Sequence, residues 1–144
     1  MLSALASFIQ VYLLFTTITI HSGMSTQFSR YDSFNPNPKL ACTGEVINDK
    51  SLVVAHRTLP CGTIVRVCNK DITKCIDARV LDRGPYGCKK KKDDLCEEYR
   101  SELDLSFAVG KSINHNGFEE IIFLSKEDKT WVRKSVKKKK PNTS

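Results

Sequence analysis

Alternation between apolar and polar residues is the clearest pattern in the middle of this chain. In Lys74–Asp82 (KCIDARVLD), Ile76, Ala78 and Val80 fall on one face, as expected of a β-strand with one face in a core. The β-branched run Thr63–Cys68 precedes it with a similar apolar face, so the two runs predict a hairpin. Other apolar runs predict strands at Phe28–Tyr31, Ser51–His56, Glu119–Ser125 and Thr130–Val136.

Two segments depart from this alternation. The run LDLSFAVGKSI (Leu103–Ile113) predicts a short helix with Ser106, or Asp104 just ahead of it, near its N-cap. The run GCKKKKDDLCEE (Gly87–Glu98) is predicted to be a charged loop. Several short strands, frequent turns and one or two short helices predict an all-β domain, either a small barrel or a sandwich.

Asp82 ends the alternating run and is followed at once by the turn residues Gly84 and Pro85. If the strand stays regular, Asp82 belongs to the core-facing set, whereas a bulge would reverse this parity. Two interpretations remain open. Asp82 is either a reactive acid held at the end of a strand or a turn residue whose side chain hydrogen-bonds the turn's backbone.

The first 29 residues contain no Asp, Glu, Lys or Arg. An apolar run, Leu13–Ile20, is followed by small residues in His21–Ser25, where a signal peptidase could cut. We interpret residues 1–23 as a secretory signal peptide, which implies an extracellular or periplasmic protein. A retained membrane anchor and a buried core helix are the alternatives. Residues 24–125 are then the folded domain, and residues 126–144 a final strand with a basic tail.

The net charge of +7 is concentrated at one end of the chain. Residues 126–144 contain eight basic and two acidic residues, so this segment carries +6 and the remainder about +1. A nearly neutral body does not indicate a nucleic-acid-binding domain. The lysine-rich tail either contacts anionic polymers or membranes, or serves only to keep the protein soluble.

Six cysteines follow the expected signal peptide, an even number that is typical of disulfides in an oxidising compartment. Their spacing matches no zinc site, so we expect no metal. Fifteen connectivities are possible. Cys68 and Cys75 flank a short loop between two predicted strands, which favours their pairing. The complete prediction is the sequential set Cys42–Cys61, Cys68–Cys75 and Cys88–Cys96.

Four ordered blocks of this sequence resemble the RlpA-like double-psi β-barrel family. They are ACTGEVIND (Ala41–Asp49), VVAHRTLPCGTIVRVCN (Val53–Asn69), ARVLDRGPYG (Ala78–Gly87) and ELDLSFAVGKSI (Glu102–Ile113). The resemblance implies a six-stranded barrel with an open groove, shared with expansins and related cellulases. It also implies a carbohydrate substrate, and for bacterial RlpA proteins lytic transglycosylase activity on peptidoglycan.

The resemblance also implies site residues. Glu45, His56 and Asp82 match the polar positions of the RlpA active site, and Asp104 is placed at the groove. In the expansin and cellulase relatives, an aspartate in a block similar to that of Asp104 is tied to acid catalysis. Further candidates for substrate contact are Arg83, Tyr31 and Tyr86.

Each candidate also has a structural interpretation. His56 can be a hydrogen-bonding residue of the fold, Glu45 an exposed loop residue, and Asp104 a helix cap. Arg83 can brace a carboxylate or a loop carbonyl. Tyr31 and Tyr86 can pack at the core or its margin instead of stacking on sugar rings.

The expected function is a secreted lytic transglycosylase that needs no cofactor and acts as a monomer on a cell-wall polysaccharide. Protonation of a glycosidic oxygen requires a carboxyl group that is neutral at working pH, and Asp82 is the expected acid and base. A non-catalytic, expansin-like wall-binding protein is the main alternative, because dense disulfides are typical of secreted expansin-like barrels. A secreted signalling or defence protein on the same barrel is the third.

Overall fold

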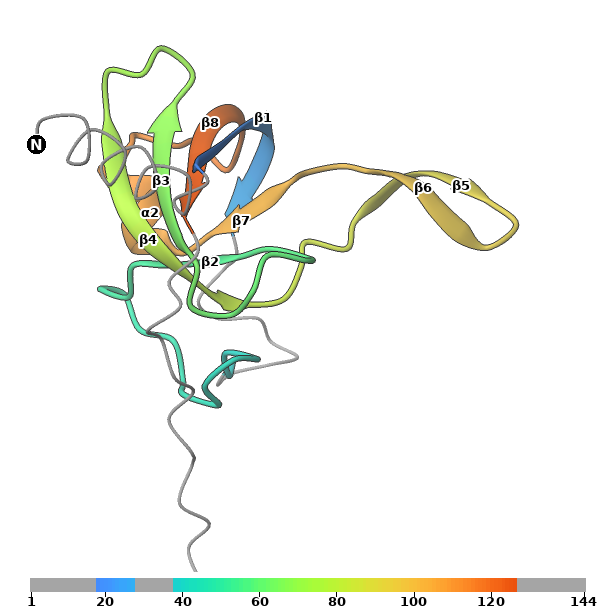
Figure 1. Cartoon of the computed structure of the whole chain (residues 1–144), viewed down its shortest axis with the longest axis horizontal. Coiled ribbons are helices and arrows are strands. Elements are labelled where there is room, and N and C mark those ends of the chain that lie inside the picture. Colours follow the sequence, from blue (N-terminus) through green and yellow to red (C-terminus); the bar gives the residue numbers. More distant parts are fainter. Residues whose placement is uncertain (1–17, 28–37, 127–144) are drawn as a thin grey trace, which may run out of the picture.

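The computed structural model describes residues 18–27 and 38–126. Six strands form a closed barrel in the order β1-β7-β2-β4-β3-β8 (Figure 1). Closure pairs each barrel strand on both sides and so removes the exposed edges of an open sheet. The all-β fold and the six-stranded barrel predicted above are therefore confirmed. The barrel strands are β1 (Ile18–Gln27), β2 (Val53–Ala55), β3 (Ile64–Asn69), β4 (Cys75–Asp82), β7 (Leu103–Leu105) and β8 (Phe118–Lys126).

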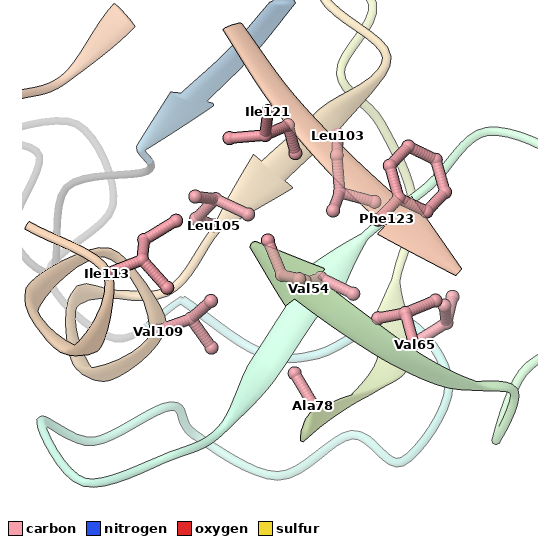
Figure 2. Packing of buried hydrophobic residues seen from close by; sticks show 11 residues of the cluster. Val54, Val65, Ala78, Leu103, Leu105, Val109, Ile113, Ile121 and Phe123 are labelled. Atoms are coloured by element: carbon pink, nitrogen blue, oxygen red, sulfur yellow. The ribbon is translucent and has the colours of Figure 1, made fainter. Parts of the chain in front are cut away.

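The barrel interior is filled by branched aliphatic side chains and one aromatic ring (Figure 2). The predicted alternation in β4 holds over most of the strand, since Ala78 and Val80 are buried, Asp77 before them is exposed, and Arg79 between them is only partly buried. Burial of such side chains supplies most of the free energy that closes the barrel. The buried members of this core are Val54, Val65, Val67, Ala78, Val80, Leu103, Leu105, Val109, Ile113, Ile121 and Phe123.

One helix, α2 (Phe107–Ser112), follows β7 directly. The hydroxyl of Ser106 accepts a hydrogen bond from the Val109 N–H, which makes Ser106 the N-cap. The predicted short helix with Ser106 near its N-cap is confirmed, but it begins only at Phe107, because Leu103–Leu105 pairs with β1 and β2 as a short strand. Asp104 is consequently a strand residue and caps nothing.

The segment predicted to be a charged loop is a two-stranded hairpin, β5 (Cys88–Lys92) and β6 (Leu95–Tyr99), which we call the arm. It projects away from the barrel (Figure 1). Cross-strand ion pairs join Lys89 to Glu98 and Lys90 to Glu97. These two strands could not be predicted from the sequence, because the arm has no apolar face that would produce an alternating pattern.

Arg57 fixes the base of the arm. Its Nη1 donates to the carbonyl oxygens of Pro85, at 3.0 Å, and Ser101, at 2.6 Å, one at each end of the arm. Its Nη2 forms a 2.8 Å ion pair with Glu102, and the guanidinium lies 4.1 Å from the ring centroid of Tyr99. One side chain therefore ties both ends of the arm to the barrel.

Three disulfides are present, and they join neighbouring cysteines in sequence: Cys42–Cys61, Cys68–Cys75 and Cys88–Cys96. The first links two loops, the second spans paired positions of the β3–β4 hairpin, and the third closes the arm. Disulfides of this density fit an extracellular or periplasmic location.

β1 begins at Ile18, so the domain boundary expected at residue 23 falls inside a barrel strand. The strands expected at Phe28–Tyr31 and Thr130–Val136, and most of the basic tail, lie outside the described residues. Within residues 18–27 and 38–126, no helix is long and apolar enough to cross a membrane.

Candidate functional site

A continuous row of paired residues crosses four strands of the barrel. Thr26 of β1 pairs with Asp104 of β7, Asp104 pairs with Ala55 of β2, and Ala55 pairs with Asp82 of β4. Paired residues of adjacent strands project from the same face of a sheet. Because Leu103 and Leu105 point into the core, Asp104 between them projects outward. Two carboxyl groups thus flank a small side chain on the outer face of the barrel.

A bulge places Asp82 in this row. Val54 pairs with Val80, but the next residue of β2, Ala55, pairs with Asp82, so that Leu81 is the extra residue in β4. The prediction that Asp82 stays on the core-facing side is therefore wrong. Leu81 packs against a second apolar cluster outside the barrel core, and Asp82 turns toward the loop that precedes β2.

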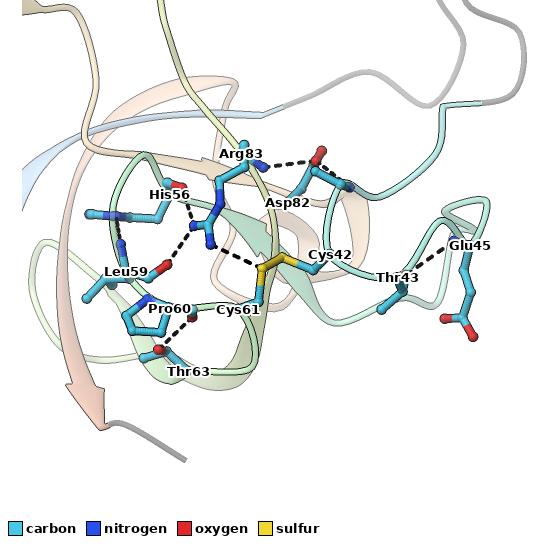
Figure 3. Close-up of a disulfide and its surroundings, with 11 residues drawn as sticks. Cys42, Thr43, Glu45, His56, Leu59, Pro60, Cys61, Thr63, Asp82 and Arg83 are labelled. Carbon is cyan, nitrogen blue, oxygen red and sulfur yellow. Dashed lines mark hydrogen bonds between the residues drawn. A yellow bond between two sulfur atoms is a disulfide. The ribbon is translucent and has the colours of Figure 1, made fainter. Parts of the chain in front are cut away.

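Backbone donors hold the carboxylate of Asp82. Its Oδ1 accepts hydrogen bonds from the Ala41 N–H at 3.0 Å and from the Arg83 N–H at 2.9 Å (Figure 3). The neighbouring Cys42 is tied to Cys61 and so fixes the loop that carries Ala41. The turn-residue interpretation describes the Arg83 contact, while the Ala41 contact joins Asp82 to a distant loop.

Arg83 is a structural brace. Its guanidinium donates to the carbonyl oxygens of Leu59, at 2.6 Å, and His56, at 3.1 Å, and its Nη2 contacts Cys61 Sγ (Figure 3). These contacts hold the loop between β2 and β3 against the end of β4. The alternative in which Arg83 braces loop carbonyls describes this arrangement, and a substrate contact stays a prediction.

Asp104 has the electrostatic character of a proton donor. Its Oδ1 accepts a 2.9 Å hydrogen bond from the Thr26 hydroxyl, which in turn lies 3.4 Å from Ser101 Oγ. Burial raises the pKa of Asp104 to about 6, the Thr26 hydrogen bond opposes that shift, and the negative charge of Asp82 adds to it. A large fraction of Asp104 therefore retains its proton in mildly acidic solution.

His56 is part of the fold. Its ring is buried, and Nδ1 accepts hydrogen bonds from the backbone N–H groups of Thr58, at 3.1 Å, and Leu59, at 2.9 Å. The ring lies edge-on to Phe123 and points away from Asp82 (Figure 3). Burial, with a smaller contribution from the charge of Arg57, lowers the pKa of His56 to about 4. The structural interpretation of His56 thus accounts for its contacts.

The free energy of unfolding should consequently fall in mild acid because of His56. Its pKa is about 4 in the folded chain against an ordinary value of 6.5, so the unfolded chain takes up the proton first. Stability from this group is complete above pH 6.5 and is lost as the pH falls toward 4, by on the order of 2 kcal/mol. Urea unfolding at pH 7.5 and at pH 4.5 measures the loss.

His56→Asn is the matched variant for this measurement, because an amide oxygen can replace Nδ1 as the acceptor but does not titrate. The difference in unfolding free energy between the two pH values should be smaller in the variant than in the wild type. An equal difference in both proteins would contradict the assignment. His115, whose pKa is also lowered by burial, is present in both proteins and cancels from the comparison.

The remaining predicted residues do not join the carboxyl pair. Glu45 is exposed, and its carboxylate points away from Asp82 (Figure 3). Tyr86 is 61% exposed beyond the end of β4, so its ring is available to solvent. Tyr31 lies outside the described residues. The structure thus brings Asp82 and Asp104 into one row but does not cluster Glu45 and His56 with them.

Thr26 is the residue that sequence reasoning misses. It stands three residues after the expected end of the signal peptide, in a stretch without clear alternation. Only its pairing with Asp104 across β1 and β7 reveals the contact. Among the residues that the structure describes, no cluster of His, Cys, Asp and Glu has the arrangement of a metal site.

Comparison with known proteins supports the resemblance seen in the four blocks. The chain is 40% identical over 62 residues to a probable endolytic peptidoglycan transglycosylase RlpA of Treponema pallidum, covering 43% of this chain and 19% of that protein. It is 39% identical over 64 residues to the Nostoc protein of the same name, covering 44% and 17%. For the endolytic peptidoglycan transglycosylase RlpA of Campylobacter jejuni, identity is 36% over 67 residues, covering 46% and 24%.

The matched part therefore spans less than a quarter of the length of each of these relatives. No family model matches the chain. Together with the closed six-stranded barrel, the matches confirm that the chain resembles RlpA-like barrel proteins.

Proposed function

We propose that this barrel is a secreted lytic transglycosylase that cleaves the glycan strands of peptidoglycan, with Asp104 as acid and base and Asp82 as its neighbouring carboxylate. The observation that carries the proposal is the row in which the two carboxyl groups flank Ala55. The names of the relatives supply the reaction class and the polymer. The acid role moves from Asp82, which the resemblance favours, to Asp104, because burial raises the pKa of Asp104 to about 6.

The reaction needs one group that first gives and then takes a proton. Asp104 protonates the glycosidic oxygen as the bond to the anomeric carbon breaks. The 6-hydroxyl of the same sugar attacks that carbon, and its proton returns to Asp104, so a 1,6-anhydro ring forms and the acid is regenerated. The carboxylate of Asp82, whose Oδ1 accepts two backbone hydrogen bonds, can stabilise positive charge that develops on the sugar.

A non-catalytic, expansin-like wall-binding protein is the second candidate. The observation that favours it is that the side chains of Glu45 and His56 point away from Asp82 (Figure 3), although the resemblance assigns all three to one active site. His56 uses Nδ1 on its own loop, and Glu45 faces solvent. A binding protein would use the same outer face of the barrel and the exposed ring of Tyr86 without breaking a bond.

Product analysis separates the two functions. Purified, oxidised protein is incubated with intact peptidoglycan and with peptidoglycan freed of stem peptides by an amidase, and the soluble fraction is examined by mass spectrometry. We expect 1,6-anhydro muropeptides or glycan fragments that increase with time. Binding of the polymer without any soluble anhydro product would contradict the enzyme and support the wall-binding protein.

A further inference from the structure

β1 contributes to the barrel along its whole length. Ile18–Gly23 pairs with Ile121–Lys126 of β8, and these account for six of the nine register pairs between β1 and β8. Only the last three residues, Ser25–Gln27, pair with β7. The N-terminal part of β1 is therefore what closes the barrel against β8.

One side chain of this segment, the half-buried ring of His21, packs on the barrel core. The ring of His21 stacks on Phe123 with 4.5 Å between ring centroids, and its Nε2 lies 3.1 Å from Ser125 Oγ. Phe123 is 1% exposed. At Gly23 the backbone passes so close to Glu102 that an added Cβ would lie 2.7 Å from Glu102 Cγ. A residue with a side chain would not fit there without movement of Glu102.

We propose that the mature protein retains the whole of β1, from Ile18 onward, and is not cut within His21–Ser25. A cut after Gly23, for example, would take away six of the nine residue pairs between β1 and β8. It would leave the backbone donors and acceptors of β8 unpaired along that edge and expose the face of Phe123 on which His21 lies. Small residues after an apolar run are thus barrel residues here, although they have the composition of a cleavage site.

The sequence upstream of β1 is compatible with this boundary. Residues 1–17 contain no charged side chain, and their most apolar stretch is Val11–Phe15. An uncharged, apolar stretch ahead of β1 is a feature of secretory leaders. The inference does not depend on the proposed enzymatic function, because it rests only on the pairing and packing of β1.

The position of the boundary also affects the carboxyl pair. Thr26, whose hydroxyl donates a hydrogen bond to Asp104, is part of β1 and lies three residues after the end of Ile18–Gly23. With Ile18–Gly23 removed, β1 would keep only the pairs of Met24–Gln27 with its two neighbours. Retention of the segment therefore holds Thr26 in register with Asp104.

The direct test is the N-terminus of the secreted protein. The full precursor is expressed in a secreting host, the folded protein is purified, and its N-terminal peptide is identified by mass spectrometry. We expect an N-terminus at or before Ile18, and an uncleaved precursor satisfies the same expectation. A folded, monodisperse protein that begins between Ser22 and Ser25 would overturn the proposal.

A pair of adjacent substitutions in the full precursor tests the packing independently. His21→Ala removes the ring that stacks on Phe123, so we expect Tm to fall by about 5 to 10 °C. Ser22→Ala changes an exposed residue on the opposite face of β1 and should leave Tm unchanged. Equal Tm values for the two variants and the wild type would show that the segment lies outside the folded domain.

Discussion

Asp104→Asn should lower the rate of anhydro-product release by a factor of about 10² to 10⁴, the usual contribution of a general acid and base. The amide has nearly the shape of the carboxyl group but cannot transfer a proton. The barrel should stay folded, because the substitution removes a carboxylate that burial disfavours. Rates of product release by wild type and variant, measured at saturating substrate, test the assignment.

The pH dependence of activity gives a sharper readout of the same residue. Asp104 must hold its proton to act, so activity should decline as the pH rises through about 6. The negative charge of Asp82 contributes to the raised pKa, so Asp82→Asn should move this decline to lower pH. Asp77→Asn is the matched control, since Asp77 is an exposed residue of the same strand and should leave the profile unchanged.

The contribution of Asp104 to the free energy of unfolding depends on pH in the opposite direction to that of His56. The raised pKa of Asp104 means that its contribution to stability is complete below pH 3.8 and is lost as the pH rises through about 6. Above pH 6 the Asn variant should therefore be at least as stable as the wild type. Loss of activity together with loss of fold at pH 7.5 would contradict the assignment of Asp104 as the acid.

Removal of the Cys42–Cys61 disulfide should destabilise the protein by about 3 kcal/mol, because it closes a loop of 19 residues. The bond also holds the segment whose Ala41 N–H donates to Asp82, so activity should fall in addition. Cys42→Ala with Cys61→Ala is the double variant to compare with the wild type. Urea unfolding gives the stability, and the product assay gives the effect on the site.

The arm provides a matched control for this experiment. Cys88→Ala with Cys96→Ala opens a disulfide with a sequence separation of 8, against 19 for Cys42–Cys61, in a hairpin that belongs to neither core cluster. The barrel's midpoint of unfolding should hardly change in that double variant. If the two double variants are destabilised equally, the arm is coupled to the barrel. If the two double variants are equally active, the loop that carries Ala41 has no role in the site.

The sequence predicts the barrel best where strands have one apolar face. β3 and β4 were predictable from alternation because their inward residues are aliphatic and their outward residues polar. β7 could not be predicted, because three residues are too few to show alternation and the residues that begin α2 follow almost directly. β1 escapes recognition because its composition continues that of the apolar segment before it.

The candidate site could be predicted only in part for similar reasons. Asp82 and Asp104 stand out in the sequence blocks. They lie in one row only because of a bulge in β4, and no local sequence pattern indicates that bulge. Thr26 becomes a partner of Asp104 only through pairing between strands that are 78 residues apart in the chain. His56 fits the family pattern, yet its Nδ1 already accepts hydrogen bonds from two backbone N–H groups of the turn after β2.

Ala55, which separates the two carboxyl groups in the row, sets how close they can stand. Its side chain is a single buried methyl group, 2% exposed, between the paired residues Asp104 and Asp82. A longer side chain at this position would meet the atoms that already cover the methyl group and would displace one carboxyl group or the other. The spacing of two acids across three strands therefore depends on the size of a residue that has no chemistry of its own.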